Sequence, residues 1–297
     1  MKQGVQFDSE GVSCAAWYFR PTGGGRFPAI AMAHGIGAVK EMYLAPYAEA
    51  FAEAGIASLV FDYRYWGASG GEPRSRAVPN AQIEDYRNAL TWLSLRDEID
   101  ESRLGVWGTS FSGGTVLHLG AYDVRVKAVV SQVGAMDVYA TAVANMGRER
   151  FDGIRRAAAM ERKRLMAGDA PTYLALASAP GGPPAFMVDA ATADWLAAAK
   201  ATAAPNLRNE IMLASLEQVL QHAPLLSVER VAPSALLLLL ARDDRVVPSD
   251  LIREAFRRAG EPKRLVELPG GHYDVYAEGE ARRTAVREAV AWFKSHL

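Results

Sequence analysis

The chain has 297 residues, of which 50% are hydrophobic and 23% are charged, and its formal net charge is −1. This length suits one large α/β domain with room for an insertion, and the apolar content is enough for a sizeable core. The near balance of charges excludes a whole-molecule field of the kind that draws proteins to nucleic acid or to anionic membranes, so we expect a small-molecule substrate.

Cysteine use and hydropathy indicate where the protein works. Cys14 is the only cysteine, so no intramolecular disulfide can form, which fits a reducing compartment. Residues 1–10 contain no apolar stretch of signal-peptide length, and the longest strongly apolar run, Ala235–Ala241, is too short to cross a bilayer. We therefore expect a soluble, cytoplasmic protein that binds neither nucleic acid nor membrane.

Strands and helices alternate along most of the chain. Val5–Phe7 and Val12–Arg20 flank a turn-forming cluster and predict an antiparallel pair. The strands predicted after them are Pro28–Ala33, Ile56–Phe61, Leu104–Trp107, Ala128–Val133, Leu236–Leu240 and Arg264–Leu268. The predicted helices are Met42–Ala54, Gln82–Leu95, Gly113–Ala121 and Glu280–His296. Continuous apolar strands are typical of a parallel sheet with helices on both faces, so the predicted fold class is α/β.

One region interrupts this alternation. Residues 137–225 are rich in Ala, Arg, Glu and Met, contain several helical stretches and show no convincing strand. We predict a helical lid insertion there, so that residues 1–136 and 226–297 form the core. The large apolar side chains that this lid can offer to a substrate are Met146, Phe151, Met160, Leu165, Met166, Tyr173, Phe186, Met187 and Trp195.

A candidate nucleophile lies in the stretch Leu104–Gly114, where a strand meets a sharp turn and a helix follows at once. A serine on such a turn is held exposed above the sheet in a strained conformation that needs small neighbours. Ser110 lies at that turn, two residues after Gly108. The usual pattern Gly-x-Ser-x-Gly has Ser112 in its last position here, and Ser112 is the alternative nucleophile.

A serine hydroxyl needs a base, and the base needs a carboxylate. The five histidines are His34, His118, His222, His272 and His296. His272 follows the last predicted strand in a glycine loop, which favours it as the base. Either Asp243 or Asp244, directly after Leu236–Leu240, can orient it. The chain order Ser, Asp, His is the order of α/β-hydrolases.

At these residues the sequence resembles the α/β-hydrolase superfamily over nearly its whole length. The matching pieces are His34-Gly35, Phe61–Ser69, Gly108-Thr109-Ser110, Asp244–Pro248 and Gly271-His272. The resemblance favours Asp244 over Asp243 and implies an oxyanion hole formed by the backbone N–H groups of Ile36 and Phe111. It also implies that His34 is structural and that Asp62 and Arg64 brace the loop after the fourth strand.

A narrower similarity extends through Gly35–Arg74 and Gly108–Gly114, to dienelactone-hydrolase-like esterases and to thiohydrolases and acyltransferases of polyketide pathways. We therefore expect a serine hydrolase that needs no cofactor and acts, through an acyl-enzyme, on an ester or thioester with a small to medium, largely apolar acyl group. An acyltransferase, cyclase or lyase of natural-product metabolism with the same three residues is the alternative.

Other classes of protein fit the sequence less well. Gly35-Ile36-Gly37, between a strand and a helix, is similar to a dinucleotide-binding turn, but Lys40 replaces the third glycine. A hydrolase-fold binding protein would typically lack one member of the triad, and none is missing. The sequence contains neither a His-Glu-x-x-His motif nor a cluster of cysteines, so no motif predicts a metal site.

The segment Arg148–Arg164 carries seven basic residues against three acidic ones. A solvated helix face explains such a run. The sharper hypothesis is a docking surface for an acidic acyl carrier protein or for the phosphates of a coenzyme A thioester.

Overall fold

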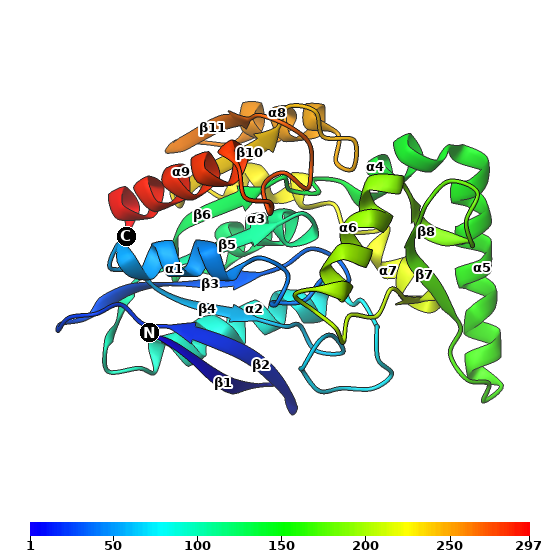
Figure 1. Cartoon of the computed structure of the whole chain (residues 1–297), viewed down its shortest axis with the longest axis horizontal. Coiled ribbons are helices and arrows are strands. Elements are labelled where there is room, and N and C mark those ends of the chain that lie inside the picture. The colour runs from blue at the N-terminus through cyan, green and yellow to red at the C-terminus, as the bar shows by residue number, and fades with distance from the viewer.

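The computed structural model describes residues 1–297, and its central feature is an eight-stranded sheet in the order β1-β2-β4-β3-β5-β6-β10-β11 (Figure 1). The strands are β1 (Lys2–Ser9), β2 (Val12–Phe19), β3 (Phe27–Ala33), β4 (Ala57–Phe61), β5 (Ile99–Thr109), β6 (Val126–Gln132), β10 (Ala235–Ala241) and β11 (Lys263–Leu268). β1 and β2 are antiparallel at one edge, β2 is antiparallel to β4, and all the other pairs are parallel. The expected mostly parallel sheet is confirmed.

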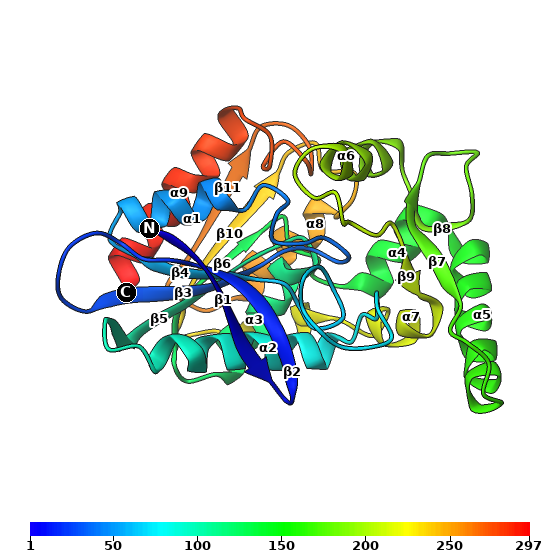
Figure 2. The same cartoon turned by 60° about the horizontal axis from the view of Figure 1, so that its bottom comes forward.

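Helices cover both faces of this sheet (Figure 2). One face carries α1 (Ala45–Glu53) and α9 (Glu280–His296), and the other carries α2 (Pro79–Ser94), α3 (Phe111–Tyr122) and α8 (Ser249–Arg258). The side chains of Leu237 and Leu239 belong to the core under α1 and α9, whereas Leu236 and Leu238 belong to the opposite core. Because successive side chains of a strand point to opposite faces and both faces are buried, the strand must be apolar throughout.

The ends of the predicted helices shift by up to three residues, and one helix is not predicted. The helix expected over Met42–Ala54 begins only at Ala45, and Pro46 in its first turn suits a helix start because proline has no N–H to pair. α8 was not predicted at all. Its sequence is strongly charged, and Leu251, Ile252, Ala255 and Phe256 recur at helical spacing, with Ile252 and Ala255 buried.

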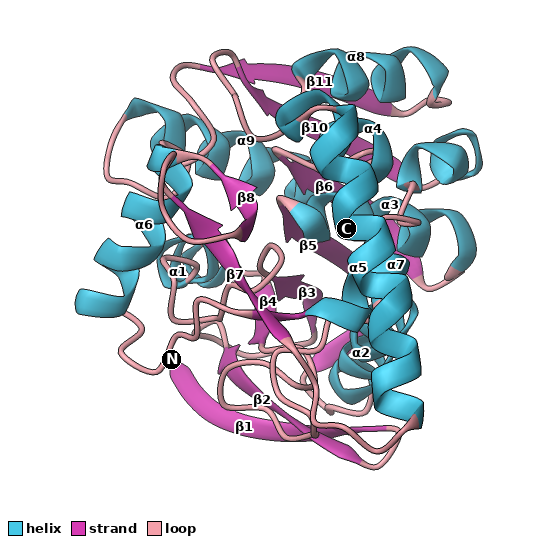
Figure 3. Cartoon of the chain, turned by 90° about the vertical axis from the view of Figure 1, so that its right-hand side faces the viewer, coloured by secondary structure: helices cyan, strands magenta, loops and turns pink.

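Residues 137–225 form a separate layer that lies at the far side of the sheet from both chain termini (Figures 1 and 3). Its helices are α4 (Val138–Met146), α5 (Arg148–Met166), α6 (Ala190–Ala201) and α7 (Leu216–Val219), with a 3₁₀ turn at Leu213–Ser215. A second 3₁₀ turn, Pro224–Arg230, packs on α3 and returns the chain to the core. The prediction that it holds no strand is wrong. β7 (Tyr173–Ser178), β8 (Ala185–Val188) and β9 (Ile211–Met212) form a small sheet in the order β8-β7-β9.

The physical reason for this error lies in strand pairing. β7 has the sequence Tyr-Leu-Ala-Leu-Ala-Ser, whose alanines and leucines favour a helix locally. It pairs in parallel with β8 and in antiparallel with β9, which comes much later in the chain. Partners at such a separation stabilise the strand without leaving a local pattern in the sequence.

Two further observations concern the chain as a whole. No helix combines the length and the apolar character that crossing a bilayer requires. Cys14 is buried in β2, and this burial raises the pKa of its thiol to about 12.

Candidate active site

Ser110 lies at the sharp turn between β5 and α3, as the sequence predicts. Its φ is 56° and its ψ is −120°, a conformation that costs a non-glycine residue free energy and that surrounding contacts must hold in place. Two glycines allow this turn. A Cβ on Gly108 would lie 2.2 Å from the Ser112 carbonyl oxygen, and one on Gly113 would lie 2.7 Å from the Gly134 Cα. The Ser110 side chain is left partly exposed.

Ser112 occupies a different environment, because it is fully buried in the first turn of α3. Its hydroxyl donates to the carbonyl oxygen of His34 and lies 2.5 Å from the hydroxyl of Tyr63. The ring of His272 is hydrogen-bonded to Ser110 and not to Ser112. Ser112 therefore joins the turn to the neighbouring strand end and does not face the histidine.

His272 and Asp244 meet Ser110 at the carboxyl edge of the sheet. The Nε2 atom of His272 is 3.1 Å from the Ser110 Oγ, and its Nδ1 atom is 2.8 Å from the Asp244 Oδ2. A carboxylate accepts hydrogen bonds, so Asp244 favours the tautomer that carries its proton on Nδ1 and leaves Nε2 free to accept. The other carboxylate oxygen of Asp244 accepts N–H bonds of 2.8 Å from Val246 and Val247.

Asp243 does not share this position. It is exposed, and its hydrogen bond to this region is the one that its backbone N–H donates to the carbonyl oxygen of Gly270. The sequence leaves the two aspartates equivalent until the resemblance is considered, and the structure brings only Asp244 to His272.

Two backbone N–H groups close to Ser110 have no hydrogen-bond partner in the chain. Phe111 is the first residue of α3, so its N–H has no partner within the helix. The N–H of Ile36 likewise has no hydrogen-bond partner in the chain. The two loops lie close together, since a Cβ on Gly35 would be 2.7 Å from the Ser110 Cβ and 3.6 Å from the Phe111 nitrogen. Ile36, Ser110 and Phe111 line one cavity.

His34 fixes the loop that carries Ile36. Its Nδ1 accepts the N–H of Gly35 at 2.8 Å, so the ring proton is on Nε2, which donates to the carbonyl oxygen of Met42 at 2.9 Å. Burial lowers the pKa of His34 to about 3, and the ring is therefore neutral at physiological pH. Its partners are backbone groups, as the structural role implied by the resemblance requires.

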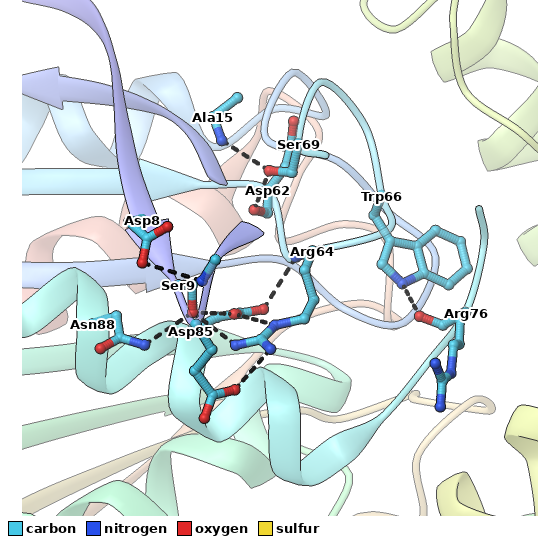
Figure 4. A network of polar contacts seen from close by, with 12 residues as sticks. Asp8, Ser9, Ala15, Asp62, Arg64, Trp66, Ser69, Arg76, Asp85 and Asn88 are labelled. Atoms are coloured by element: carbon cyan, nitrogen blue, oxygen red, sulfur yellow. Dashed lines mark hydrogen bonds and ion pairs between the residues drawn. The ribbon is translucent and has the colours of Figure 1, made fainter. Parts of the chain in front are cut away.

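Asp62 and Arg64 anchor the loop after β4, part of which is shown in Figure 4. Asp62 accepts the backbone N–H of Lys40 at 2.7 Å and pairs with the Lys40 ammonium at 2.7 Å. Arg64 donates to Asp85 at 2.7 Å and to Ser9 at 2.8 Å. Lys40 is thus held by an ion pair at the position where a dinucleotide-binding turn needs its third glycine.

Comparison with known proteins decides the family. A family model described as X-Pro dipeptidyl-peptidase (S15 family) matches residues 10–274. The chain belongs to this hydrolase family.

Individual relatives place this hydrolase more narrowly. Quorum-quenching protein AidA of Acinetobacter baumannii (strain MDR-ZJ06) is 33% identical over 293 residues, which cover 98% of this chain and 93% of AidA. A thiohydrolase of Eupenicillium brefeldianum is 27% identical over 293 residues, covering 94% and 92%. The crystal structure of the α/β-hydrolase GrgF from Penicillium sp. sh18 matches with a TM-score of 0.86 and 27% identity, over 100% of this chain and 99% of GrgF. The α/β-hydrolase fold and the thiohydrolase-like branch are confirmed.

A cavity of about 220 Å³ opens beside Ser110 between the core of this hydrolase and residues 137–225. Most of its lining is apolar, and among the nine apolar side chains that the sequence offered, Met146, Phe186 and Met187 line it. Trp195 instead lines a smaller space of about 30 Å³ next to His272. Met160, Met166 and Tyr173 are exposed at the surface, so most of the apolar candidates do not face the cavity.

The other histidines stay away from Ser110. His118 lies in α3 and His296 at the end of α9. His222 is buried, its ring stacks on Phe111 with a centroid distance of 4.5 Å, and burial lowers its pKa to about 3. His222 therefore packs against the side chain of Phe111. Nowhere in the chain do three or more His, Cys, Asp or Glu side chains gather so as to hold a metal ion.

Sequence reasoning missed two cavity-lining arginines. Arg245 directly follows Asp244, and Arg150 lies in the first turns of α5. The position of Arg245 at a strand end is a signal that the sequence contains. Arg150 has no such signal, because the packing of the insertion on the core decides which face of α5 meets the cavity.

Proposed function

We propose that this hydrolase cleaves an ester or thioester of a small to medium, largely apolar acyl group through a Ser110–His272–Asp244 triad. One observation carries the proposal, namely the continuous chain of contacts from the Ser110 Oγ through the His272 ring to Asp244, at 3.1 and 2.8 Å. An α/β-hydrolase with this chain of contacts can make a serine nucleophilic, because the base lies within reach of the hydroxyl proton and is itself oriented.

The mechanism starts from the tautomer that Asp244 selects. The Ser110 Oγ attacks the acyl carbon while its proton passes to Nε2 of His272, and Asp244 stabilises the resulting imidazolium. The N–H groups of Phe111 and Ile36 donate to the oxyanion of the tetrahedral intermediate, which is usually the largest single electrostatic contribution. His272 then protonates the leaving oxygen or sulfur, and an acyl-enzyme remains. Water activated by His272 releases the acid.

The same acyl-enzyme can also react with a nucleophile other than water. If an alcohol, amine or hydroxyl group of the acyl chain itself reaches Ser110 before water, the products are those of an acyltransferase or a cyclase, and lyase chemistry is also known for this fold class. The family and its thiohydrolase-like relatives support ester or thioester hydrolysis first. Residues 137–225 act in this proposal as a lid, since they supply Met146, Phe186 and Met187 to the cavity that opens at Ser110. A cytoplasmic location remains a prediction from the single cysteine.

The experiment that tests the function is labelling with a fluorophosphonate probe followed by intact mass and peptide mapping. We expect one adduct, on Ser110, with labelling much slower in His272→Ala because the serine then lacks its base. A panel of p-nitrophenyl esters and N-acetylcysteamine thioesters of increasing acyl length then identifies the preferred acyl group. An unlabelled protein, or an adduct on Ser112, would contradict the proposal and favour a hydrolase-fold binding protein.

A glycine in the loop of Ile36 offers a test of the oxyanion donors. Gly37 has φ +73°, and a Cβ there would lie 2.2 Å from a methyl carbon of Leu176 in β7. Gly37→Ala must therefore displace either the loop or the insertion. We expect kcat to fall about 10²-fold, the scale of losing one oxyanion donor, with a much smaller change in KM.

Gly153→Ala in α5 is the matched control for this substitution. No atom lies within 4 Å of a Cβ at Gly153, and alanine there should raise the free energy of unfolding by about 0.5–1 kcal/mol without changing kcat. Thermal unfolding and steady-state kinetics of both variants separate the two effects. A Gly37→Ala enzyme with normal kcat would remove Ile36 from the mechanism.

Fewer residues support docking of an acidic carrier protein or a coenzyme A thioester on α5 than the basic run of the sequence suggests. Arg148 and Arg155 pair with Asp152, and Arg162 and Arg164 pair with Glu217 and Glu161. These ion pairs account for much of the basic run. Arg156 forms no ion pair, and together with Arg155 and Arg162 it lines a surface hollow of about 530 Å³. This hollow is where we place a carrier if one binds.

Charge reversal tests that docking site. In the double variant Arg155→Glu/Arg156→Glu we expect kcat/KM for carrier-bound acyl groups to fall about tenfold at low ionic strength, because rim charges act mainly on association. Turnover of a small ester should be unchanged. Arg257→Glu/Arg258→Glu, an adjacent pair on α8 whose partners are Glu254 and Glu229, is the control. An equal loss on both substrates, or no loss at all, would exclude docking on α5.

A further inference from the structure

Two arginines line the cavity beside Ser110 and come from different parts of the chain. Arg150 belongs to α5 in the insertion and is half-buried, whereas Arg245 belongs to the loop after β10 and is exposed. The rest of the wall near Ser110 is mostly apolar, with Val138, Phe186 and Val247 among its residues. The cavity thus combines an apolar chamber with two guanidinium groups.

Neither guanidinium is neutralised within the chain. Arg150 donates one hydrogen bond, to the carbonyl oxygen of Ala185 in β8, and forms no ion pair. Its neighbour on the helix, Arg148, pairs with Asp152 at 2.8 Å. The side chain of Arg245 has neither a hydrogen bond nor an ion pair. The contact with Ala185 fixes the Arg150 guanidinium at the cavity wall and leaves its other N–H groups free.

Asp189 is the one carboxylate in the cavity lining, and it is already engaged. Its Oδ2 accepts the backbone N–H and the hydroxyl of Thr192, both at 2.7 Å, and so caps the first turn of α6. No ion pair joins Asp189 to Arg150 or to Arg245. The positive charges of the cavity therefore exceed its negative charge by one.

The guanidinium of Arg150 lies at a largely apolar wall without a counter-ion, and a guanidinium is well shaped to hold the two oxygens of a carboxylate. We propose that Arg150, assisted by Arg245, binds a carboxylate at the far end of the acyl group, so that the substrate is a half-ester or half-thioester of a dicarboxylic acid. This inference rests on the proposed function, and it names the substrate class of the same site.

The size of the cavity favours the acyl side of the substrate over the leaving group. A volume of about 220 Å³ holds a short acyl chain with its carboxylate. A phosphopantetheine arm is much longer than this space, so its phosphate would lie outside the cavity when its thioester reaches Ser110. The carboxylate is therefore the anion to which we assign the two arginines.

The test compares mono-p-nitrophenyl esters of adipic and pimelic acid with the same esters in which the free carboxylate is capped as a methyl ester. The measured quantity is the ratio of kcat/KM for the free acid to kcat/KM for its capped counterpart. We expect this ratio to exceed one in the parent enzyme and to fall about tenfold to a hundredfold in Arg150→Gln, the scale of one hydrogen bond to a charged group. Arg245→Gln should lower it less, because the exposed side chain is better solvated.

Two matched variants distinguish the loss of a carboxylate contact from a general loss of structure. Arg150→Lys keeps the charge and should restore part of the ratio, and Arg257→Gln on α8, an exposed arginine paired with Glu254, should leave it unchanged. A ratio at or below one in the parent enzyme, or no change in Arg150→Gln, would overturn the assignment. A loss in Arg150→Gln that appears only with phosphopantetheine thioesters, and not with the free-acid esters, would also overturn it.

Binding without turnover keeps this inference separate from the proposed function. Calorimetric titration of Ser110→Ala with adipate should show binding that weakens about tenfold or more in the Ser110→Ala/Arg150→Gln protein. That result would support the arginine site even if no ester were cleaved. Equal affinity in both proteins, or none in either, would overturn it even if neutral esters were cleaved rapidly.

Discussion

Ser110→Ala is expected to lower kcat by about 10⁵- to 10⁶-fold on any ester that the parent enzyme cleaves, because the members of a triad act as a unit. The substitution removes a hydroxyl that is partly exposed and whose partner is the ring of His272 at 3.1 Å. The Nε2 atom of His272 loses this contact, but the ring keeps its hydrogen bond of 2.8 Å to Asp244. The melting temperature should therefore change little, and steady-state kinetics together with thermal unfolding measure the two quantities.

Ser112→Ala is the matched control and should behave in the opposite way. Its hydroxyl is buried between the carbonyl oxygen of His34 and the hydroxyl of Tyr63, so alanine leaves both groups without this partner. A cost of about 1–3 kcal/mol in the free energy of unfolding follows. Fluorophosphonate labelling of Ser110 should persist. If Ser112→Ala abolished labelling while Ser110→Ala kept turnover, the nucleophile would be misassigned.

The sequence predicts the core sheet well because a strand that is buried on both faces must be apolar at every position. Leu236–Leu240 is apolar at every position, and β10 runs from Ala235 to Ala241 with all its residues buried. The same logic locates the site. Ser110, Asp244 and His272 each follow a strand of one parallel sheet, and the carboxyl ends of such strands meet at one edge.

The insertion could not be predicted to the same depth. The strands β7 and β9 depend on pairing between distant segments, and the position of the Arg150 side chain depends on its hydrogen bond to the carbonyl oxygen of Ala185 in β8. Neither property has a local period in the sequence. This region supplies part of the cavity wall beside Ser110, so the sequence indicates the chemistry of the site more readily than its substrate.

The two adjacent aspartates show where geometry adds to the sequence. Asp243 and Asp244 are equivalent as residue types, but Asp244 reaches His272 while Asp243 is exposed. The Oδ1 of Asp244 accepts two backbone N–H groups, from Val246 and Val247, at 2.8 Å each. That oxygen is thereby fixed in position, and it determines which atom of the side chain faces the histidine.

Asp244→Asn should consequently reverse the tautomer of His272. The amide oxygen of the asparagine must replace Oδ1, because the N–H groups of Val246 and Val247 need an acceptor, and the amide nitrogen then faces Nδ1 of His272. An NH₂ group donates, so Nδ1 becomes the acceptor and the ring proton moves to Nε2. Nε2 then has no lone pair for the proton of Ser110. We expect kcat/KM to fall about 10⁴-fold, as tautomer reversal does in serine proteases.

Asp243→Asn serves as the control for this tautomer argument, since the substituted side chain is exposed and the backbone bond to Gly270 survives. Its kcat/KM should stay within about twofold of the parent value, as is usual for surface substitutions that remove no buried contact. Kinetics and the rate of fluorophosphonate labelling should give the same ranking of the two variants. A greater loss in Asp243→Asn would assign the acid to the wrong aspartate, and equal small losses would mean that His272 takes its tautomer without help from either.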